Sequence, residues 1–179
     1  MILVYLMYIF TDLAVIFLDV DGVLHPARGP GSNSGLSIFE APKMANLKAL
    51  VECVQPHARI VLSSNWRQFD HMKRRVDDEI KKVGIHEGIY DCTDVINGTD
   101  RHTEVCHWLT KFKPSRFVIV DDLDLSKFNS LAMCLKRYQQ TGIWSVTKKH
   151  FVCTDFIDGL DSNALAHCVK VLQTVKRVW

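Results

Sequence analysis

The sequence lacks any C-x-x-C pair, although it contains six cysteines. They are Cys53, Cys92, Cys106, Cys134, Cys153 and Cys168. A structural zinc site requires paired ligands, and a disulfide framework is typical of much smaller secreted chains. We therefore expect reduced thiols that pack as small hydrophobic side chains, in a cytoplasmic protein.

The sequence also lacks a strong net charge and an apolar run of membrane length. The formal net charge is +2, so no overall field favours nucleic acid or an anionic membrane. Residues 1–10 are almost wholly apolar, but a bilayer span needs about 20 residues. Neither a basic region nor a small-residue cleavage site flanks this run, as a signal peptide would require. We expect no membrane span, and we interpret residues 1–12 as an N-terminal extension, either an edge element or a start-site extension.

No internal repeat, low-complexity tract or interdomain linker divides the rest of the chain. A length of 179 residues suits one α/β domain, which we place at residues 13–179. Short apolar runs at 14–18, 59–62, 89–92, 117–120 and 151–153 predict strands. Amphipathic segments at 42–54, 69–83, 100–112, 127–138 and 161–175 predict helices. This alternation predicts a single Rossmann-like three-layer α/β/α domain with a mostly parallel sheet.

Polar residues follow three of these strands, where a parallel sheet binds its ligands. The segments are 19–22 (Asp-Val-Asp-Gly), 63–67 (Ser-Ser-Asn-Trp-Arg) and the pair Asp121 and Asp122. Carboxylates brought so close repel one another unless a cation joins them. Because the ligands are all oxygen atoms, Mg²⁺ is the expected cation.

The positions of these residues predict their roles. Asp19 ends its strand, so its carboxylate can bind the metal and attack phosphorus. Asp21 lies two residues further and can reach the leaving oxygen, and Gly22 permits the sharp turn there. Ser63 is placed to donate a hydrogen bond to the transferring phosphoryl group.

These segments resemble the motifs of the haloacid dehalogenase (HAD) superfamily. Residues 19–24 (Asp-Val-Asp-Gly-Val-Leu) are similar to motif I, 60–63 (Ile-Val-Leu-Ser) to motif II, and 118–122 (Val-Ile-Val-Asp-Asp) to motif IV. The resemblance covers residues 14 to 155. Residues 62–67, with the pattern Arg-x-x-Glu-x-x-x-Trp-Leu at 101–109, look most like the capless HAD domain of "Swiss Army Knife" RNA repair proteins.

The resemblance implies a phosphatase that works through an aspartyl-phosphate. It implies that Asp19 is the nucleophile and a metal ligand, and that Asp21 is the general acid/base with its backbone carbonyl as a second ligand. It also implies that Asp122 meets the metal, with Asp121 in support. Ser63 is implied as a phosphate binder, and we predict the same role for Ser64, although Ser64 and Asn65 could also simply cap the following helix.

Motif III of the family is a Lys or Arg near the start of the helix before the motif IV strand. Arg101 fits by position, and Lys111, Lys113 and His102 remain alternatives. For three other features we favour ordinary structural roles. We expect Trp66 to pack, His25 to lie in a surface loop, and the basic residues of 73–82 to form a solvated helix face.

The sequence has no room for a large cap. The intervals 21–64 and 101–120 are too short for a cap domain of about 50 residues, although the segment 26–39 could form a small flap. An open site suits a phosphorylated macromolecule, either a nucleic-acid end or a phosphoprotein, because the substrate itself must exclude water. Two alternatives stay open: a catalytically silent HAD-like binding module and a small-metabolite phosphatase.

Overall fold

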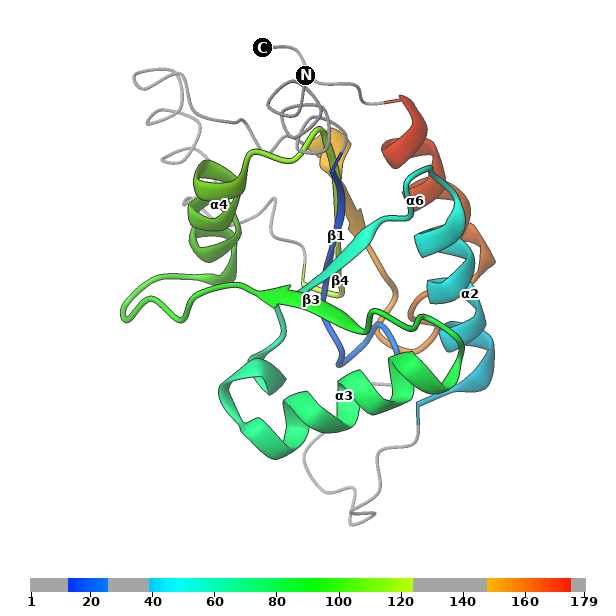
Figure 1. The fold of residues 1–179 in the computed structure, drawn as a ribbon, viewed down its shortest axis with the longest axis horizontal. Coiled ribbons are helices and arrows are strands. Elements are labelled where there is room, and N and C mark those ends of the chain that lie inside the picture. Colours follow the sequence, from blue (N-terminus) through cyan, green and yellow to red (C-terminus); the bar gives the residue numbers. More distant parts are fainter. Residues whose placement is uncertain (1–12, 26–38, 124–147, 175–179) are drawn as a thin grey trace, which may run out of the picture.

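A computed structural model describes residues 13–25, 39–123 and 148–174 (Figure 1). Five parallel strands form one open sheet in the order β3-β2-β1-β4-β5. Their bounds are Ala14–Leu18 (β1), Arg59–Leu62 (β2), Ile89–Cys92 (β3), Arg116–Asp121 (β4) and Phe151–Cys153 (β5). The predicted α/β class and all five predicted strands are confirmed.

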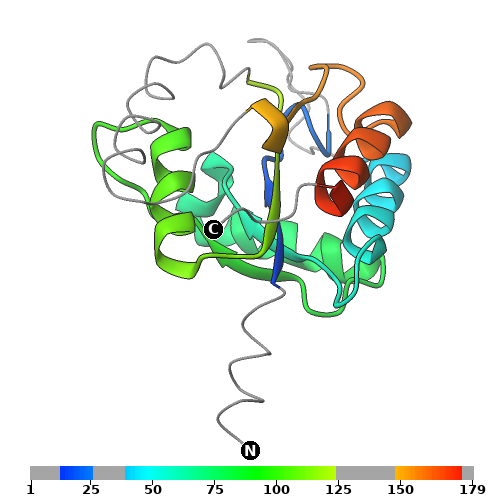
Figure 2. The same cartoon turned by 90° about the horizontal axis from the view of Figure 1, so that it is seen from above.

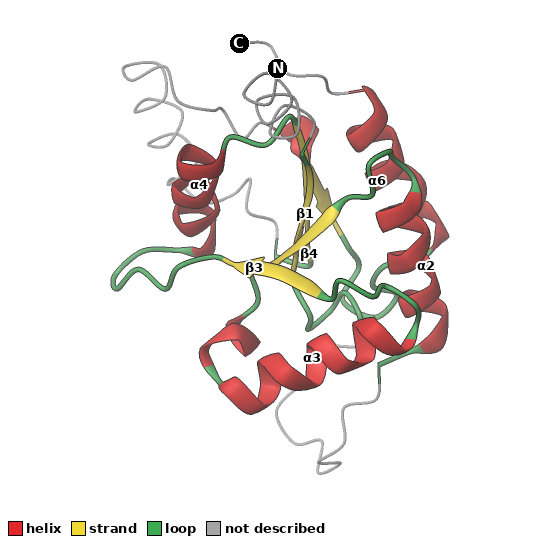
Figure 3. Ribbon diagram, in the orientation of Figure 1, coloured by secondary structure: helices red, strands yellow, loops and turns green. Residues whose placement is uncertain are grey.

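Helices cover both faces of the sheet. Four α-helices and two 3₁₀ helices lie within the described residues: α2 (Ala41–Glu52), η1 (Asn65–Gln68), α3 (Asp70–Lys82), α4 (Arg101–Phe112), η3 (Lys148–His150) and α6 (Ser162–Thr174). Helices α2, α3 and α6 pack on one face and α4 on the other, as Figures 1 and 2 show. Figure 3 shows the strands as the middle of three layers. None of the described helices has both the length and the apolar character that a membrane crossing requires.

Strand β1 shows why the chain folds in this way. All five of its residues are buried, because both faces of a central parallel strand are covered. Its side chains alternate between the two layers. Ile16 and Leu18 pack in the large cluster with α2, α3 and α6, whereas Val15 and Phe17 pack with α4. A continuous apolar run is therefore the pattern that this position requires.

Asp100 and Asp161, the first residues of two predicted helical segments, are candidate N-caps by sequence, and both caps are confirmed. The Asp100 carboxylate accepts a hydrogen bond from Thr103 N at 2.9 Å at the start of α4, and Asp161 accepts one from Ala164 N at 2.7 Å at the start of α6. The apolar spacing of the 69–83 segment predicts that Phe69 faces inward with Val76 and Ile80, and this placement is wrong. Phe69 is the extended N-cap residue of α3, lies outside its apolar stripe and is 54% exposed.

Some predictions concern segments outside the described residues. They are the N-terminal extension at 1–12, nearly all of the flap at 26–39, the helix at 127–138 and the last residue of the 161–175 helix.

The strand order places the site. From β1 the chain proceeds to β2 and β3 on one side, and then crosses to β4 and β5 on the other. Ligands of open parallel sheets bind where this direction reverses, beyond the carboxyl ends of the strands. In this sheet the reversal lies between β1 and β4, the strands that lead to Asp19 and Asp121.

Candidate active site

The hydrogen-bond ladder continues past the ends of the central strands. Asp19 N donates to Val120 O, and Ser63 N donates to Leu18 O, both at 3.0 Å. Asp121, Asp19 and Ser63 therefore occupy neighbouring register positions on adjacent strands, which lie about 4.8 Å apart. The predicted convergence of the three segments on one edge of the sheet is present in the structure.

Three carboxylates gather at this edge. Asp19, Asp121 and Asp122 each place one oxygen within 4.8 Å of the others. Asp19 is only 3% exposed, and its buried Oδ1 accepts no hydrogen bond from any described residue. Burial and the charge of Asp19 raise the pKa of Asp121 and of Asp122. A divalent cation would remove this penalty, so the donor set fits the oxygen-only site that Mg²⁺ prefers.

Arg101 contacts the cluster from the α4 side of the sheet. It is the first residue of α4, and its Nη1 lies 2.8 Å from Asp19 Oδ2 and 2.6 Å from Asp121 Oδ2. Burial would lower the pKa of Arg101, but the two carboxylates outweigh it and raise the pKa further. A permanent cation thus lies where the transferring phosphoryl group would need one.

The alternatives to Arg101 lie elsewhere on α4. Lys111 and Lys113 are at the opposite end of the helix, about 15 Å along its axis. His102 is buried, and its Nε2 faces the Cys106 sulfur at 3.8 Å. Among these candidates, Arg101 is the one that the fold brings to the acidic cluster. Its motif III role remains a prediction.

Asp21 is held by two ring nitrogens. Trp66 Nε1 donates to Asp21 Oδ2 at 2.9 Å, and His25 Nε2 lies 3.0 Å from Asp21 Oδ1. Burial raises the pKa of Asp21, but the adjacent His25 and the hydrogen bond from Trp66 outweigh it and lower the pKa. The Asp21 carboxylate is therefore outside the three-carboxylate group. Its predicted metal contact is through its backbone carbonyl.

His25 corrects a prediction. We expected a surface-loop histidine, and the structure buries it to 5% exposure. Gly22 N donates to His25 O at 2.9 Å, which folds the chain back after Asp21. The imidazole then packs edge-on against Phe39 and at a tilt against Trp66. Local sequence gives no sign of this burial, because both partner rings come from other segments.

The two serines after β2 differ in their surroundings. Ser63 Oγ is buried and has no hydrogen-bond partner within the described part of the chain. Ser64 Oγ accepts a hydrogen bond from Trp66 N at 3.4 Å, so Ser64 caps η1. Ser63 thus has its hydroxyl available for a phosphate oxygen, whereas the Ser64 hydroxyl already has a structural role. Phosphate binding by either residue remains a prediction.

Arg67 and Glu104 form a buried ion pair that sequence reasoning did not identify. The Arg67 guanidinium donates from Nη2 to Glu104 Oε2, and Glu104 Oε1 accepts from Ile96 N at 3.0 Å. Arg67 also binds three backbone oxygens that follow β2 and β3. They are Ser63 O and Ser64 O, each at 2.8 Å, and Thr93 O at 3.0 Å. The pair thus ties the segment of Ser63 to α4, the helix of Arg101. Both residues stand in the patterns quoted above, but their pairing depends on long-range contacts.

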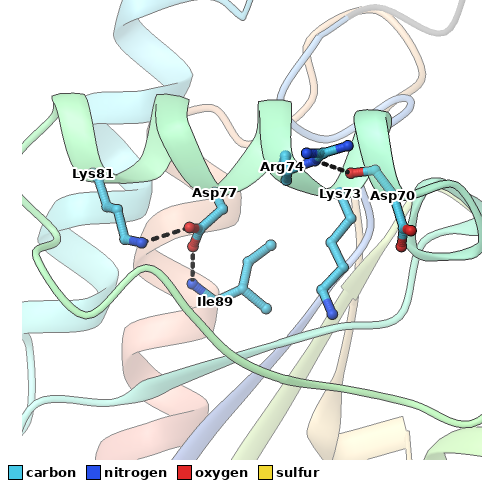
Figure 4. A pocket seen from close by; sticks show the side chains of 6 residues that line it. All are labelled: Asp70, Lys73, Arg74, Asp77, Lys81 and Ile89. Carbon is cyan, nitrogen blue, oxygen red and sulfur yellow. Dashed lines mark hydrogen bonds and ion pairs between the residues drawn. The ribbon is translucent and has the colours of Figure 1, made fainter.

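A separate open pocket of about 470 Å³ lies along α3 beside β3 (Figure 4). Its lining is Asp70, Lys73, Arg74, Asp77, Lys81 and Ile89. The Asp77 carboxylate accepts a hydrogen bond from Lys81 Nζ at 2.6 Å. It also accepts one from Ile89 N, and Figure 4 shows both interactions. Opposite charges largely cancel here, and no predicted site residue lines the pocket. The basic residues of 73–82 are mostly exposed, as expected for a solvated helix face.

Comparison with known proteins identifies the family. A family model described as "HAD domain in Swiss Army Knife RNA repair proteins" matches residues 15–165. No curated protein and no solved structure shows a significant match to the chain. The matched region contains β1 to β5, the acidic cluster, Arg101, Trp66 and His25, and it indicates a phosphatase-type hydrolase. The chain belongs to the family of HAD domains found in Swiss Army Knife RNA repair proteins.

Proposed function

We propose that the protein is a Mg²⁺-dependent phosphomonoester hydrolase that works through an aspartyl-phosphate on Asp19. The observation that carries the proposal is the cluster of Asp19, Asp121 and Asp122 with Arg101 at the carboxyl ends of β1 and β4. A buried cluster of this kind is costly to fold, and it is typical of sites that hold a cation and an anionic substrate.

The metal would be held by Asp19, Asp122 and the backbone carbonyl of Asp21, with Asp121 in support. When bound, Mg²⁺ would neutralise charge on the transferring phosphoryl group. Arg101 and the Ser63 hydroxyl would orient the remaining phosphoryl oxygens.

The protein's own residues then complete two half-reactions. The Asp19 carboxylate attacks phosphorus, the bond to the leaving oxygen breaks, and Asp21 donates its proton to that oxygen. In the second half, water attacks the phosphorus of the aspartyl-phosphate and Asp21 takes the water's proton. The products are an alcohol and inorganic phosphate, and Asp19 is regenerated.

We further propose that the substrate is a phosphorylated macromolecule, a nucleic-acid end or a phosphoprotein. All described α-helices flank the sheet, so within the described residues none forms a cap over its carboxyl edge. Under this proposal the substrate itself shields the reacting atoms from water.

Phosphate release tests the proposal. The wild type is assayed with Mg²⁺ on 3′- and 5′-phosphorylated oligonucleotides, phosphopeptides and small phosphomonoesters, and again in excess EDTA. We expect Mg²⁺-dependent release that Asp19→Asn abolishes, because an amide cannot attack phosphorus. Asp94→Asn is the matched control, since this carboxylate is 60% exposed and lies outside the cluster. Full activity in EDTA, or in Asp19→Asn, would contradict the mechanism. Tight phosphate binding without turnover of any substrate would favour the silent binding module.

A further inference from the structure

We infer that Trp66 and His25 are positioning residues that hold the Asp21 carboxylate in its acid/base orientation; this inference rests on the proposed function. The family motif accounts for Asp21 itself but assigns no partner to its carboxylate. The structure supplies one partner from η1 and one from the turn after β1.

Both oxygens of Asp21 are engaged. The indole N–H of Trp66 only donates, so Asp21 Oδ2, at 2.9 Å, must be the acceptor. His25 Nε2 lies 3.0 Å from the other oxygen. A free carboxylate rotates broadly about its terminal torsion. Two partners on opposite oxygens restrict that rotation to one orientation.

The two partners are themselves fixed by packing. His25, Phe39 and Trp66 form a cluster of three rings, with centroids 5.4 to 6.0 Å apart, and each residue is at most 9% exposed. Trp66 also lies three residues after Ser63, on the capped 3₁₀ turn η1. The segment 63–66 therefore places both the Ser63 hydroxyl, which would bind the phosphate, and the Trp66 N–H, which donates to Asp21.

A bond between an indole and a carboxylate is not by itself a sign of function. Trp108 Nε1 donates to Asp91 Oδ2 at 2.6 Å beneath α4, where packing is sufficient explanation. Asp21 and Asp91 are both partly exposed, and the difference at Asp21 is its place and its second partner: it follows Asp19 by two residues at the carboxyl edge of the sheet, and His25 meets its other oxygen. The Asp21 side chain is 46% exposed, so water could satisfy its oxygens without help. Two buried rings that reach a half-exposed carboxylate therefore serve its orientation rather than its burial.

The dependence of rate on the leaving group tests this role. A positioned general acid is worth about 10² to 10⁴ in rate when the leaving group needs a proton, and little when it does not. Trp66→Phe should lower kcat/KM about 10- to 100-fold on an alkyl phosphate and less than about threefold on p-nitrophenyl phosphate, because kcat/KM reports the first half-reaction, in which only the alkyl leaving group needs the proton of Asp21. The matched control Trp108→Phe should change both rates by the same factor, because Asp91 lies outside the site.

A second pair of variants tests His25 without removing the tryptophan. His25→Gln keeps a nitrogen donor near the position of Nε2 and should retain most of the rate on the alkyl phosphate. His25→Leu should lose much of that rate but little of the rate on p-nitrophenyl phosphate. In an Asp21→Asn background, neither Trp66→Phe nor His25→Leu should cause further selective loss. This cycle separates positioning of Asp21 from a general effect on folding.

The outcomes are distinguishable. If the wild type turns over both esters and the variants lose both rates equally, Trp66 and His25 are structural and the inference is wrong, while the proposed function stands. If the wild type turns over neither ester nor any substrate of the screen above, the proposed function fails and the inference with it. Where Trp66→Phe does not fold, the comparison of His25→Gln with His25→Leu decides the question.

Discussion

Gly22 illustrates how one residue serves two requirements of the site. Its φ of +68° is a left-handed conformation that other L residues adopt at a cost. A Cβ at this position would also stand 2.4 Å from Asp122 Oδ2 and 2.7 Å from Asp122 Cβ. The turn after Asp21 and the second carboxylate of the motif IV segment therefore fit together only if residue 22 has no side chain.

We predict that Gly22→Ala displaces Asp122 and raises the Mg²⁺ concentration needed for half-maximal phosphate release by tenfold or more. Gly98→Ala is the control, since Gly98 also has a positive φ, of +76°, but nothing lies within 4 Å of its added Cβ. Both variants should lose about 1–2 kcal/mol of stability from backbone strain. Equal Mg²⁺ dependence in the two variants would show that the contact with Asp122 is unimportant.

At the scale of elements, the Arg67–Glu104 pair joins η1 to α4. The Arg67 and Glu104 side chains are 3% and 8% exposed, so neither charge is compensated by water. A buried pair adds little net stability relative to apolar residues, but removal of one partner leaves an uncompensated charge.

Arg67→Met should therefore lower the free energy of unfolding by about 3–5 kcal/mol. Lys82→Met, which breaks the exposed pair with Glu79, should cost less than about 1 kcal/mol. Urea denaturation followed by circular dichroism measures both. A loss below 1 kcal/mol for Arg67→Met would mean that this pair is not important for stability.

Strand β4 and the turn η3 meet through stacked rings. His150 lies against Phe117 with ring centroids 4.3 Å apart and planes 11° apart. Burial, together with the charge of Lys149, lowers the pKa of His150 from 6.5 to about 4. The unfolded chain therefore binds a proton at higher pH than the folded protein does, and stability is lost as pH falls from 6.5 towards 4.

His150→Phe should keep the stacking and remove this titration. Between pH 7 and pH 4 we expect His150→Phe to lose about 1–2 kcal/mol less stability than the wild type. This difference is smaller than the full pKa shift would give, because the His150 ring is partly exposed. Thermal denaturation across this range measures the difference. Parallel pH profiles for the two proteins would contradict the prediction.

For the whole molecule, the carboxyl edge of the sheet bears on substrate size. Because no helix of the described residues caps this edge, we expect binding energy to come from surface beyond the phosphate, where remote contacts can lower the barrier. About 1.4 kcal/mol of such contact gives a tenfold gain in rate. The exposed cations near the start of α3, Lys73 and Arg74, are candidate contacts for a polyanion. The basic 111–116 segment, a second candidate by sequence, lies at the amino end of β4 and could meet only a substrate that extends to the opposite edge of the sheet.

A phosphorylated oligonucleotide should therefore have a higher kcat/KM than its mononucleotide, and a phosphopeptide a higher kcat/KM than its phosphoamino acid. The expected gain is about one to three decades, which corresponds to about 1.4–4 kcal/mol of added contact. If nucleic acid is the partner, KM should rise with salt concentration. The assay compares each large substrate with its truncated form at two salt concentrations. A small phosphomonoester that matches every macromolecule would overturn the idea.

The sequence by itself determined the α/β class, the five strands and the identity of the acidic cluster. Apolar runs and strand-end carboxylates are local patterns, and parallel topology brings strand ends together whatever lies between them. For this reason Asp19, Asp121 and Asp122 could be grouped from the order of strands and carboxylates along the chain alone.

Only the tertiary structure decided which basic side chain contacts those carboxylates and which residues contact the Asp21 carboxylate. Arg101 reaches Asp19 because α4 packs over β1 and β4, whereas Lys111 and Lys113 are separated from the cluster by the length of the same helix. His25 was misplaced on the surface because its ring partners, Phe39 and Trp66, come from other segments. Contacts between residues far apart in the chain depend on how the layers pack, and no local pattern of residues encodes that packing.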